Sequence, residues 1–186
     1  MEIQTEIHQL VERLAHGEYD GLHGGRTKIL DNLMGIDREL LITTLTKYFQ
    51  FADENVQCEI ATILVKLEPD KYLSYALHLL SHKTPNVRFG MCMLLLEAYR
   101  QRTNSSVSLA LANVVRADPD VEVRFAAANA LEIAGDASAI SALEYAKAVD
   151  KQKTEDGWTV SSIAASAIKA IKKRESGNRP SSKSRR

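Results

Sequence analysis

Two histidines, His78 and His82, stand four residues apart in the sequence HLLSH, a spacing that can do metal chemistry. On an α-helix this spacing places both imidazoles on one face, where they can bind a zinc ion. A metalloprotease helix of this kind has a glutamate directly after the first histidine, and here that residue is Leu79. No acidic cluster nearby offers a third ligand, and imidazoles in the last turn of a helix are favoured by its dipole. We therefore expect surface histidines and no metal site.

Nucleophilic chemistry is not expected either. Cys58 and Cys92 lie in apolar helical segments, with no histidine or aspartate expected beside them at the same level of the helix. The sequence contains no GxSxG motif, no Gly-rich phosphate loop and no paired-carboxylate motif. Two cysteines are too few for a fold that depends on disulfide bonds, so we expect two buried, reduced thiols. The sequence predicts a protein that is not an enzyme and has no cofactor.

A stripe of polar and aromatic residues follows the helix that carries the two histidines, on the face opposite a row of leucines. It consists of Lys71, Tyr75, His78 and His82, spaced i, i+4, i+7 and i+11. Tyr145 has a similar position relative to Leu143 on a later helix. These residues form either an ordinary solvated helix face or a binding surface.

The helices that position these residues recur along the chain. Three segments begin with Asp or Thr and have valine three residues later, namely Asp53–Leu67, Thr84–Ala98 and Asp120–Ala134. Aspartate and threonine at this place are N-caps, and Pro85 suits the first helical position. Apolar residues follow at i+4, i+7 and i+8 from Val56, Val87 and Val123, as on a buried helix face. Weaker copies begin at Leu22 and Val160, so the pattern recurs every 31–37 residues.

A chain break and a second helix follow each copy. Gly35 and Gly135 are expected to end first helices through a positive φ, and Pro69 ends another. We expect the second helices at residues 37–50, 70–82, 104–116 and 136–149, and a further helix at 3–16. No alternating pattern predicts a strand. Tandem helix pairs of this length predict an all-α protein of the α-solenoid type.

Two details concern the C-terminal half. Seventeen of the 22 alanines lie at or after Ala110, which predicts a closer approach of helices there than in the N-terminal half. Trp158 is expected to cover the open end of the last repeat, because end repeats must hide an exposed core.

The segment Asp118–Gly135 (DPDVEVRFAAANALEIAG) resembles the short bacterial HEAT-like repeats first recognised in phycobilisome lyases. Those repeats start with Asp-Pro-x-Val-Arg, continue with Ala-Ala-x-Ala-Leu and end in a Gly-Asp turn. The matching residues here are Val123-Arg124, Ala127-Ala128-Asn129-Ala130-Leu131 and Gly135-Asp136. Val87-Arg88 matches another start, whereas Val56-Gln57 keeps only the valine. The resemblance is strong over residues 84–150, fair over 53–83 and weak over 1–52.

The resemblance implies a right-handed superhelix of about five HEAT-like helix pairs over residues 1–174, with the second helices lining the concave face. The candidate protein-binding residues on that face are Lys71, Tyr75, His78, His82 and Tyr145. The structural repeat positions are Val56, Val87, Arg88, Asp120, Val123 and Arg124. We expect the two arginines to pair with acidic residues at neighbouring helix starts, such as Asp53 or Asp120, because bidentate Arg–carboxylate pairs suit stacked repeats.

The expected function is a non-catalytic protein–protein interaction module, in an adaptor, scaffold or immunity-type role, that binds a protein or peptide on the concave face. The resemblance also implies an alternative, a bilin lyase or lyase accessory protein. Its groove would need an aromatic and charged lining, and only 6% of the residues are aromatic. A further alternative is a nucleic-acid-associated HEAT-like protein that uses a basic C-terminal tail.

The charge is unevenly distributed, although the formal net charge is zero. Residues 172–186 hold seven basic residues and one acidic residue, so residues 1–171 sum to −6. The segment 175–186 has no aliphatic or aromatic residue and is predicted to be a disordered tail. The acidic sum argues against a basic nucleic-acid groove in the body, although a local patch can hide within it, and leaves the tail for weak contacts.

The location of the protein is predicted from two further features. No apolar run is long enough to span a bilayer, and the N-terminus has acidic residues where a signal peptide needs basic ones. We therefore expect a cytoplasmic protein without membrane contact.

Overall fold

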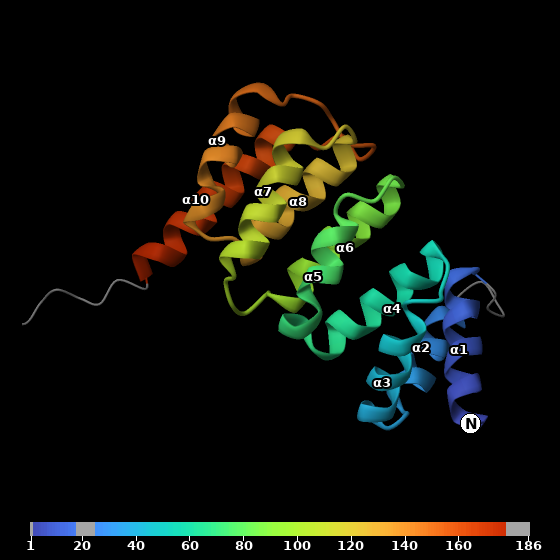
Figure 1. The fold of residues 1–186 in the computed structure, drawn as a ribbon. Helices are drawn as coiled ribbons and strands as arrows, with labels where there is room; N and C mark the ends of the chain where they lie inside the picture. The colour runs from blue at the N-terminus through green and yellow to red at the C-terminus, as the bar shows by residue number, and fades with distance from the viewer. Residues whose placement is uncertain (1, 18–24, 178–186) are drawn as a thin grey trace, which may run out of the picture. The chain divides into compact units, whose positions relative to one another are not determined.

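The computed structural model describes residues 2–17 and 25–177, and these residues are almost entirely helical (Figure 1). The described helices are α1 (Glu2–Ala15), α2 (Gly25–Met34), α3 (Arg38–Tyr48), α4 (Glu54–Leu67), α5 (Pro69–Leu79), α6 (Pro85–Ala98), α7 (Ser105–Ala117), α8 (Val121–Ala134), the 3-10 helix η1 (Ala137–Ala139), α9 (Ile140–Val149) and α10 (Val160–Gly177). One isolated β-bridge joins Lys153 to Thr159. The all-α, solenoid-like class is confirmed. None of the described helices combines the length and the apolar character that crossing a bilayer requires.

The chain divides into two compact units, residues 1–76 and 77–186. Unit 1 holds α1 to α4 and most of α5, and unit 2 holds the end of α5 and α6 to α10. Helix α10 continues to Gly177, so residues 175–177 of the predicted tail are helical. Residues 178–186 of that tail, and Leu22 of the weak first copy, lie outside the described residues.

The helices follow the predicted alternation of first and second helices. In sequence order the pairs are α2 with α3, α4 with α5, α6 with α7 and α8 with α9. Helices α1 and α10 stand at the two ends of this alternation. Each predicted second helix agrees with the structure to within about three residues.

Unit 2 has the layered packing of stacked repeats. Its first helices pack in the order α6, α8, α10, and its second helices α7 and α9 pack against each other. Helix α8 contacts α6, α7 and α10, and its buried side chains are mostly alanines. Because an alanine side chain is a single methyl group, three neighbours can approach one helix closely. The alanine-rich half of the sequence therefore forms closely packed helices, as predicted.

Unit 1 has a core of larger side chains. Helix α1 packs against α2, α3 and α4, and it buries Ile7, Leu10, Val11 and Leu14. Helices α3 and α4 contribute buried leucines and isoleucines to the same unit. Apolar burial of this kind stabilises by roughly 25 cal/mol for each Å² removed from water.

The helix starts confirm two of the three predicted N-caps. The side chains of Asp53 and Asp120 each accept hydrogen bonds from two backbone amides at the starts of α4 and α8. Thr84 occupies the N-cap position of α6 but makes no side-chain cap hydrogen bond, so that part of the prediction is wrong. Pro85 is the first residue of α6, as predicted. Pro69 begins α5 directly after Glu68, the C-cap of α4.

Two further predictions about chain ends are wrong. In the described residues only Gly17 and Gly157 have a positive φ, so neither Gly35 nor Gly135 ends its helix in that way. Gly135 has a φ of −76°. A Cβ atom there would lie 2.5 Å from the Leu131 carbonyl oxygen, so glycine is required by close packing. Trp158 is 63% exposed and therefore does not cover the end of the repeats.

Candidate functional site

The unit 1 part of the predicted stripe, Lys71 and Tyr75, is engaged within the unit. Tyr75 is half-buried, and its ring stacks on Phe49 with a centroid distance of 4.6 Å. The Lys71 Nζ lies 3.0 Å from Glu68 Oε2 and 5.1 Å from the ring centroid of Tyr72. The hydrogen bond to Glu68 raises the pKa of Lys71. These contacts hold both side chains in place against their own unit.

The unit 2 part of the stripe, His78 and His82, does not share a helix face. His78 is exposed in the last turn of α5, which ends at Leu79. His82 lies beyond that end, and its Nδ1 accepts a hydrogen bond of 3.0 Å from the Thr84 amide. The predicted helix over residues 70–82 is thus three residues too long, and the i, i+4 zinc geometry does not form.

Tyr145 lies on an exposed surface of unit 2. The ring is 48% exposed, and the Arg116 guanidinium carbon lies 5.2 Å from its centroid. Val149, one turn further along α9, is 56% exposed. We call Arg116, Tyr145 and Val149 the second-helix surface, because they come from α7 and α9. These three residues line an open groove of about 340 Å³ that also includes Lys151.

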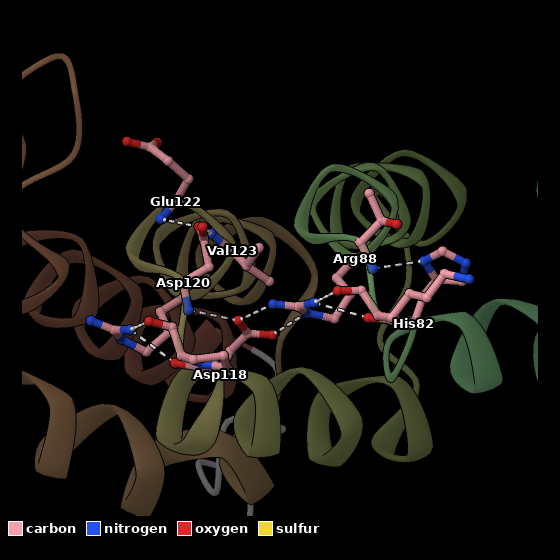
Figure 2. A network of polar contacts seen from close by, with 10 residues as sticks. His82, Arg88, Asp118, Asp120, Glu122 and Val123 are labelled. Carbon is pink, nitrogen blue, oxygen red and sulfur yellow. Dashed lines mark hydrogen bonds and ion pairs between the residues drawn. The ribbon is translucent and has the colours of Figure 1, made fainter.

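Arg88, at the start of α6, is the first member of a buried ion-pair network. It is only 7% exposed, and its Nε and Nη2 donate to the two carboxylate oxygens of Asp118, each at 2.7 Å. Its Nη1 donates to the carbonyl oxygens of His82 and Lys83 at 2.9 and 3.1 Å. The hydrogen bonds to Asp118 raise the pKa of Arg88. Figure 2 shows the guanidinium held between the chain ahead of its own helix and Asp118.

Arg124, at the same position of α8, repeats this arrangement. Its Nε donates to Asp150 Oδ2 at 2.7 Å and its Nη2 to Gln152 Oε1 at 2.6 Å. Its Nη1 donates to the carbonyl oxygens of Asp118 and Pro119 at 2.8 and 3.1 Å. Asp118 therefore binds one arginine through its side chain and the next through its backbone. We call Arg88, Asp118, Arg124 and Asp150 the arginine–aspartate ladder.

The ladder confirms that both arginines pair with acidic residues but corrects the partners. Asp118 and Asp150 are the C-caps of α7 and α9, so they lie at the ends of second helices. Asp120, an expected partner, instead caps α8 through the amides of Glu122 and Val123 (Figure 2). Asp53 caps α4 in the same manner. Val56, Val87 and Val123 are described at the predicted helix positions, and Val56 and Val123 are fully buried.

One cluster in unit 1 has side chains of the metal-ligating types. The ligand atoms of Glu12, His16 and Asp53 lie within 4.8 Å of one another. The His16 Nε2 is 3.3 Å from Glu12 and 3.5 Å from Asp53, and Tyr48 donates a hydrogen bond to Glu12. Burial, and then this hydrogen bond, raise the pKa of Tyr48 to about 12. Glu12, His16 and Asp53 are partly exposed, and their mutual ion pairs account for the arrangement.

Both cysteines are free thiols. Cys92 is buried as predicted, and burial raises its pKa to about 12. Cys58 is only half-buried, and burial together with nearby acidic residues raises its pKa to about 11. A thiol with such a pKa is protonated at neutral pH and is a poor nucleophile.

The second-helix surface is the exposed arrangement that contains a predicted binding residue, and it has no acid–base or nucleophilic pair. No protein-family model matches this sequence, and no curated protein matches it either. The structure defines the class only as an all-α, solenoid-like protein of packed helices with a solvent-facing aromatic–arginine surface. Of these residues only Tyr145 is predicted from the sequence, because the proximity of Arg116 and Val149 to it depends on how α7 packs on α9.

Proposed function

We propose that this protein is a non-catalytic protein-interaction module, and that the second-helix surface of unit 2 binds a protein or peptide. The observation that carries the proposal is the exposed Tyr145 ring, which lies against the Arg116 guanidinium and beside the exposed Val149. Tyrosine and arginine are the residue types most enriched among the energetically dominant residues of protein interfaces. The resemblance to HEAT-like repeats supports the same class of function.

The scaffold behind this surface supports a binding role. The stacked helices of unit 2 and the buried ladder fix the positions of α7 and α9, so the surface is held before a partner arrives. A surface that is ordered in advance loses less conformational entropy on binding. The groove offers area and orientation rather than reacting groups, which is how repeat proteins bind their partners.

The charge of the groove indicates the chemistry of the partner. Its two aspartates, Asp118 and Asp150, are each paired with an arginine of the ladder. The cationic groups left at the surface are Arg116 and Lys151. A matching partner presents a carboxylate beside an apolar side chain, with the carboxylate meeting Arg116 and the apolar group covering Val149.

Affinity purification with mass spectrometry from the native cell tests the proposal. The variants are Tyr145→Ala and, as a matched control, Phe89→Ala, which removes a 38% exposed aromatic ring from α6 in the first-helix layer. We expect one protein to be retained by the wild type and by Phe89→Ala and to be lost from Tyr145→Ala, with all three melting within a few degrees. A photo-crosslinking residue at position 149 should capture that protein. Equal retention by both variants would remove this surface as the binding site.

Tyr75→Ala would be a weaker test of the proposal than Tyr145→Ala. Its ring stacks on Phe49 within unit 1, so the substitution removes a packing contact together with any binding contact. Tyr145 has no stacked aromatic neighbour among the described residues, and its one ring contact is the exposed Arg116.

A further inference from the structure

A second groove of unit 2, about 1160 Å³ in volume, has a basic lining. It lies among the loop between α6 and α7, the end of α8 and the last turns of α10. We call this groove the basic groove. The cationic residues among its described lining are Arg100, Arg102, Lys173 and Arg174. The acidic residues in its lining are Asp136 and Glu175. Residues more than 70 positions apart in the sequence therefore contribute to one cationic surface.

Three of the four cations belong to exposed residues. Arg100, Arg102 and Lys173 are exposed. Arg100 is 3.9 Å from the equally exposed Glu97, a separation at which a surface pair is weak. Arg102 lies 4.7 Å over the Tyr99 ring. Arg100 and Lys173 are exposed enough to reach a ligand at little desolvation cost.

Arg174 has a positioning role. Its guanidinium donates to the carbonyl oxygens of Leu131, Glu132 and Gly135 at the end of α8, at distances of 3.2, 2.6 and 2.9 Å. It thereby fixes the last turns of α10 against α8, so that Lys173 is held beside the loop that carries Arg100 and Arg102.

One of the two acidic residues is already engaged. Asp136 accepts hydrogen bonds from Ser105 Oγ at 2.7 Å and from Ser138 Oγ at 2.5 Å, and it caps η1. Partial burial raises the pKa of Asp136, but the hydrogen bonds from Ser138 and Ser105 outweigh this, so its pKa lies below the usual value. The carboxylate keeps its charge, and its oxygens accept hydrogen bonds from both serines.

The acidic net charge of residues 1–171 is not shared equally by the two units. Counted along the sequence, residues 1–76 carry −6, whereas residues 77–171 sum to zero. The acidic excess of the body thus belongs entirely to unit 1. After Gly177, which lines the groove, the sequence adds Arg179, Lys183, Arg185 and Arg186 and no acidic residue. The basic groove is continuous in sequence with the most basic part of the chain.

The lining also distinguishes between kinds of polyanion. None of the described residues that line the basic groove is aromatic, so these residues offer no platform on which the bases of a single strand could stack. Arginines and lysines on a surface without base-reading geometry contact phosphates, and a duplex presents these at high density. We propose that the basic groove binds the phosphate backbone of double-stranded nucleic acid without sequence specificity.

Fluorescence anisotropy with a labelled 20-base-pair DNA duplex tests this in the full chain. The groove variant is Arg100→Gln/Lys173→Gln, which spares Arg174. The matched control is Lys66→Gln/Lys153→Gln, which removes the same charge from exposed residues of α4 and of the loop after α9 that line neither groove. A tail variant replaces all four basic residues after Gly177 with glutamine. Thermal melting shows that each variant folds.

We expect the salt dependence of binding to separate the variants. The slope of log K against log salt concentration is negative, and each lost phosphate contact reduces its magnitude by about 0.9. The magnitude for the groove variant should therefore be about 1.8 smaller than for the wild type. It should bind about tenfold or more weakly at 50 mM salt, and the control less than about twofold. Adding the groove substitutions to the tail variant should reduce the magnitude of its slope by a similar amount.

Three results would overturn the inference. They are an absence of wild-type binding at 50 mM salt, equal effects of the groove and control variants, and displacement of the duplex by polyglutamate as effectively as by unlabelled duplex. The last result would assign the groove to an acidic protein segment instead. The assay is independent of the second-helix surface, so its failure leaves the proposed protein-binding function untouched.

Discussion

The substitution Asp118→Asn tests the arginine–aspartate ladder most directly. The side chains of Arg88 and Asp118 are 8% and 5% exposed, and two hydrogen bonds of 2.7 Å join them. Asparagine has nearly the same shape as aspartate, but one of its two terminal groups is a hydrogen-bond donor. One guanidinium N–H therefore loses its acceptor, and the buried positive charge loses its counter-ion.

The expected cost follows from this burial. Removing one partner of a buried ion pair costs about 3–5 kcal/mol, because the remaining charge is left without compensation. Asparagine keeps one of the two hydrogen bonds, and Arg88 keeps its bonds to two backbone carbonyls. We therefore expect a loss at the lower end, about 3 kcal/mol. For a chain of this size, that corresponds to a decrease of about 6–12 °C in Tm.

Urea unfolding followed by circular dichroism measures the loss, and hydrogen exchange of α6 to α8 assigns it to unit 2. The control is Glu144→Gln, which removes a carboxylate 3.3 Å from Lys147 in an exposed pair and should cost less than about 0.5 kcal/mol. Replacing the whole pair, Arg88→Met with Asp118→Leu, should recover part of the stability. If Asp118→Asn proves as stable as Glu144→Gln, the ladder does not hold unit 2 together.

Four smaller predictions concern stability and thiol chemistry. Gly135→Ala should cost about 2 kcal/mol in a thermal melt, because its Cβ would lie 2.5 Å from the backbone oxygen of Leu131. Asp120→Ala should cost about 1 kcal/mol by the same measurement, through loss of the N-cap of α8. Burial raises the pKa of Cys92 to about 12 from an ordinary value of 9.0, so the folded protein keeps a proton that the unfolded chain releases. The contribution of this thiol to the free energy of unfolding should therefore be constant below pH 9 and fall as the pH rises from about 9 to 12, and Cys92→Ala should remove that contribution. A thiol reagent at pH 8 should label Cys58 slowly and Cys92 only after unfolding; rapid labelling of the native protein at Cys92 would contradict its burial.

Local features of the sequence predict the helices because helices are determined locally. The apolar spacing from Val123 and the N-cap Asp120 lie within one segment, and together they locate α8 almost to the residue. The end of α5 was harder to predict, since the sequence after Leu79 contains no glycine or proline until Pro85. There the chain closes with i to i+3 hydrogen bonds from Ser81 and His82, which tighten the last turn and stop the helix.

The contacts between helices could not be predicted in the same way. Arg88 and its partner Asp118 are 30 residues apart, and no sequence feature near either residue identifies the other as its partner. Asp120 is the better local candidate because it starts a helix, but its oxygens are used by the first amides of α8. The pairing depends on how one repeat stacks on the next. The same holds for Arg116 and Tyr145, which meet because α7 packs against α9.

The ladder gives a physical reason for the order of residues at the start of a repeat. Asp118 ends α7, binds the arginine of the preceding first helix through its side chain, and offers its carbonyl oxygen to Arg124 six residues later. One residue thus joins two successive first helices, which explains why an aspartate precedes the Val-Arg pair. The corresponding residue of α4 is Gln57, whose Nε2 donates to the carbonyl oxygen of Phe49 at 3.0 Å, much as Arg88 does to that of His82. A neutral glutamine does not require a carboxylate partner. The residue that follows α5 at the position equivalent to Asp118 is His82. Its Nδ1 accepts a hydrogen bond from the amide two residues on, as the Asp118 carboxylate does, so the local turn is the same at both positions.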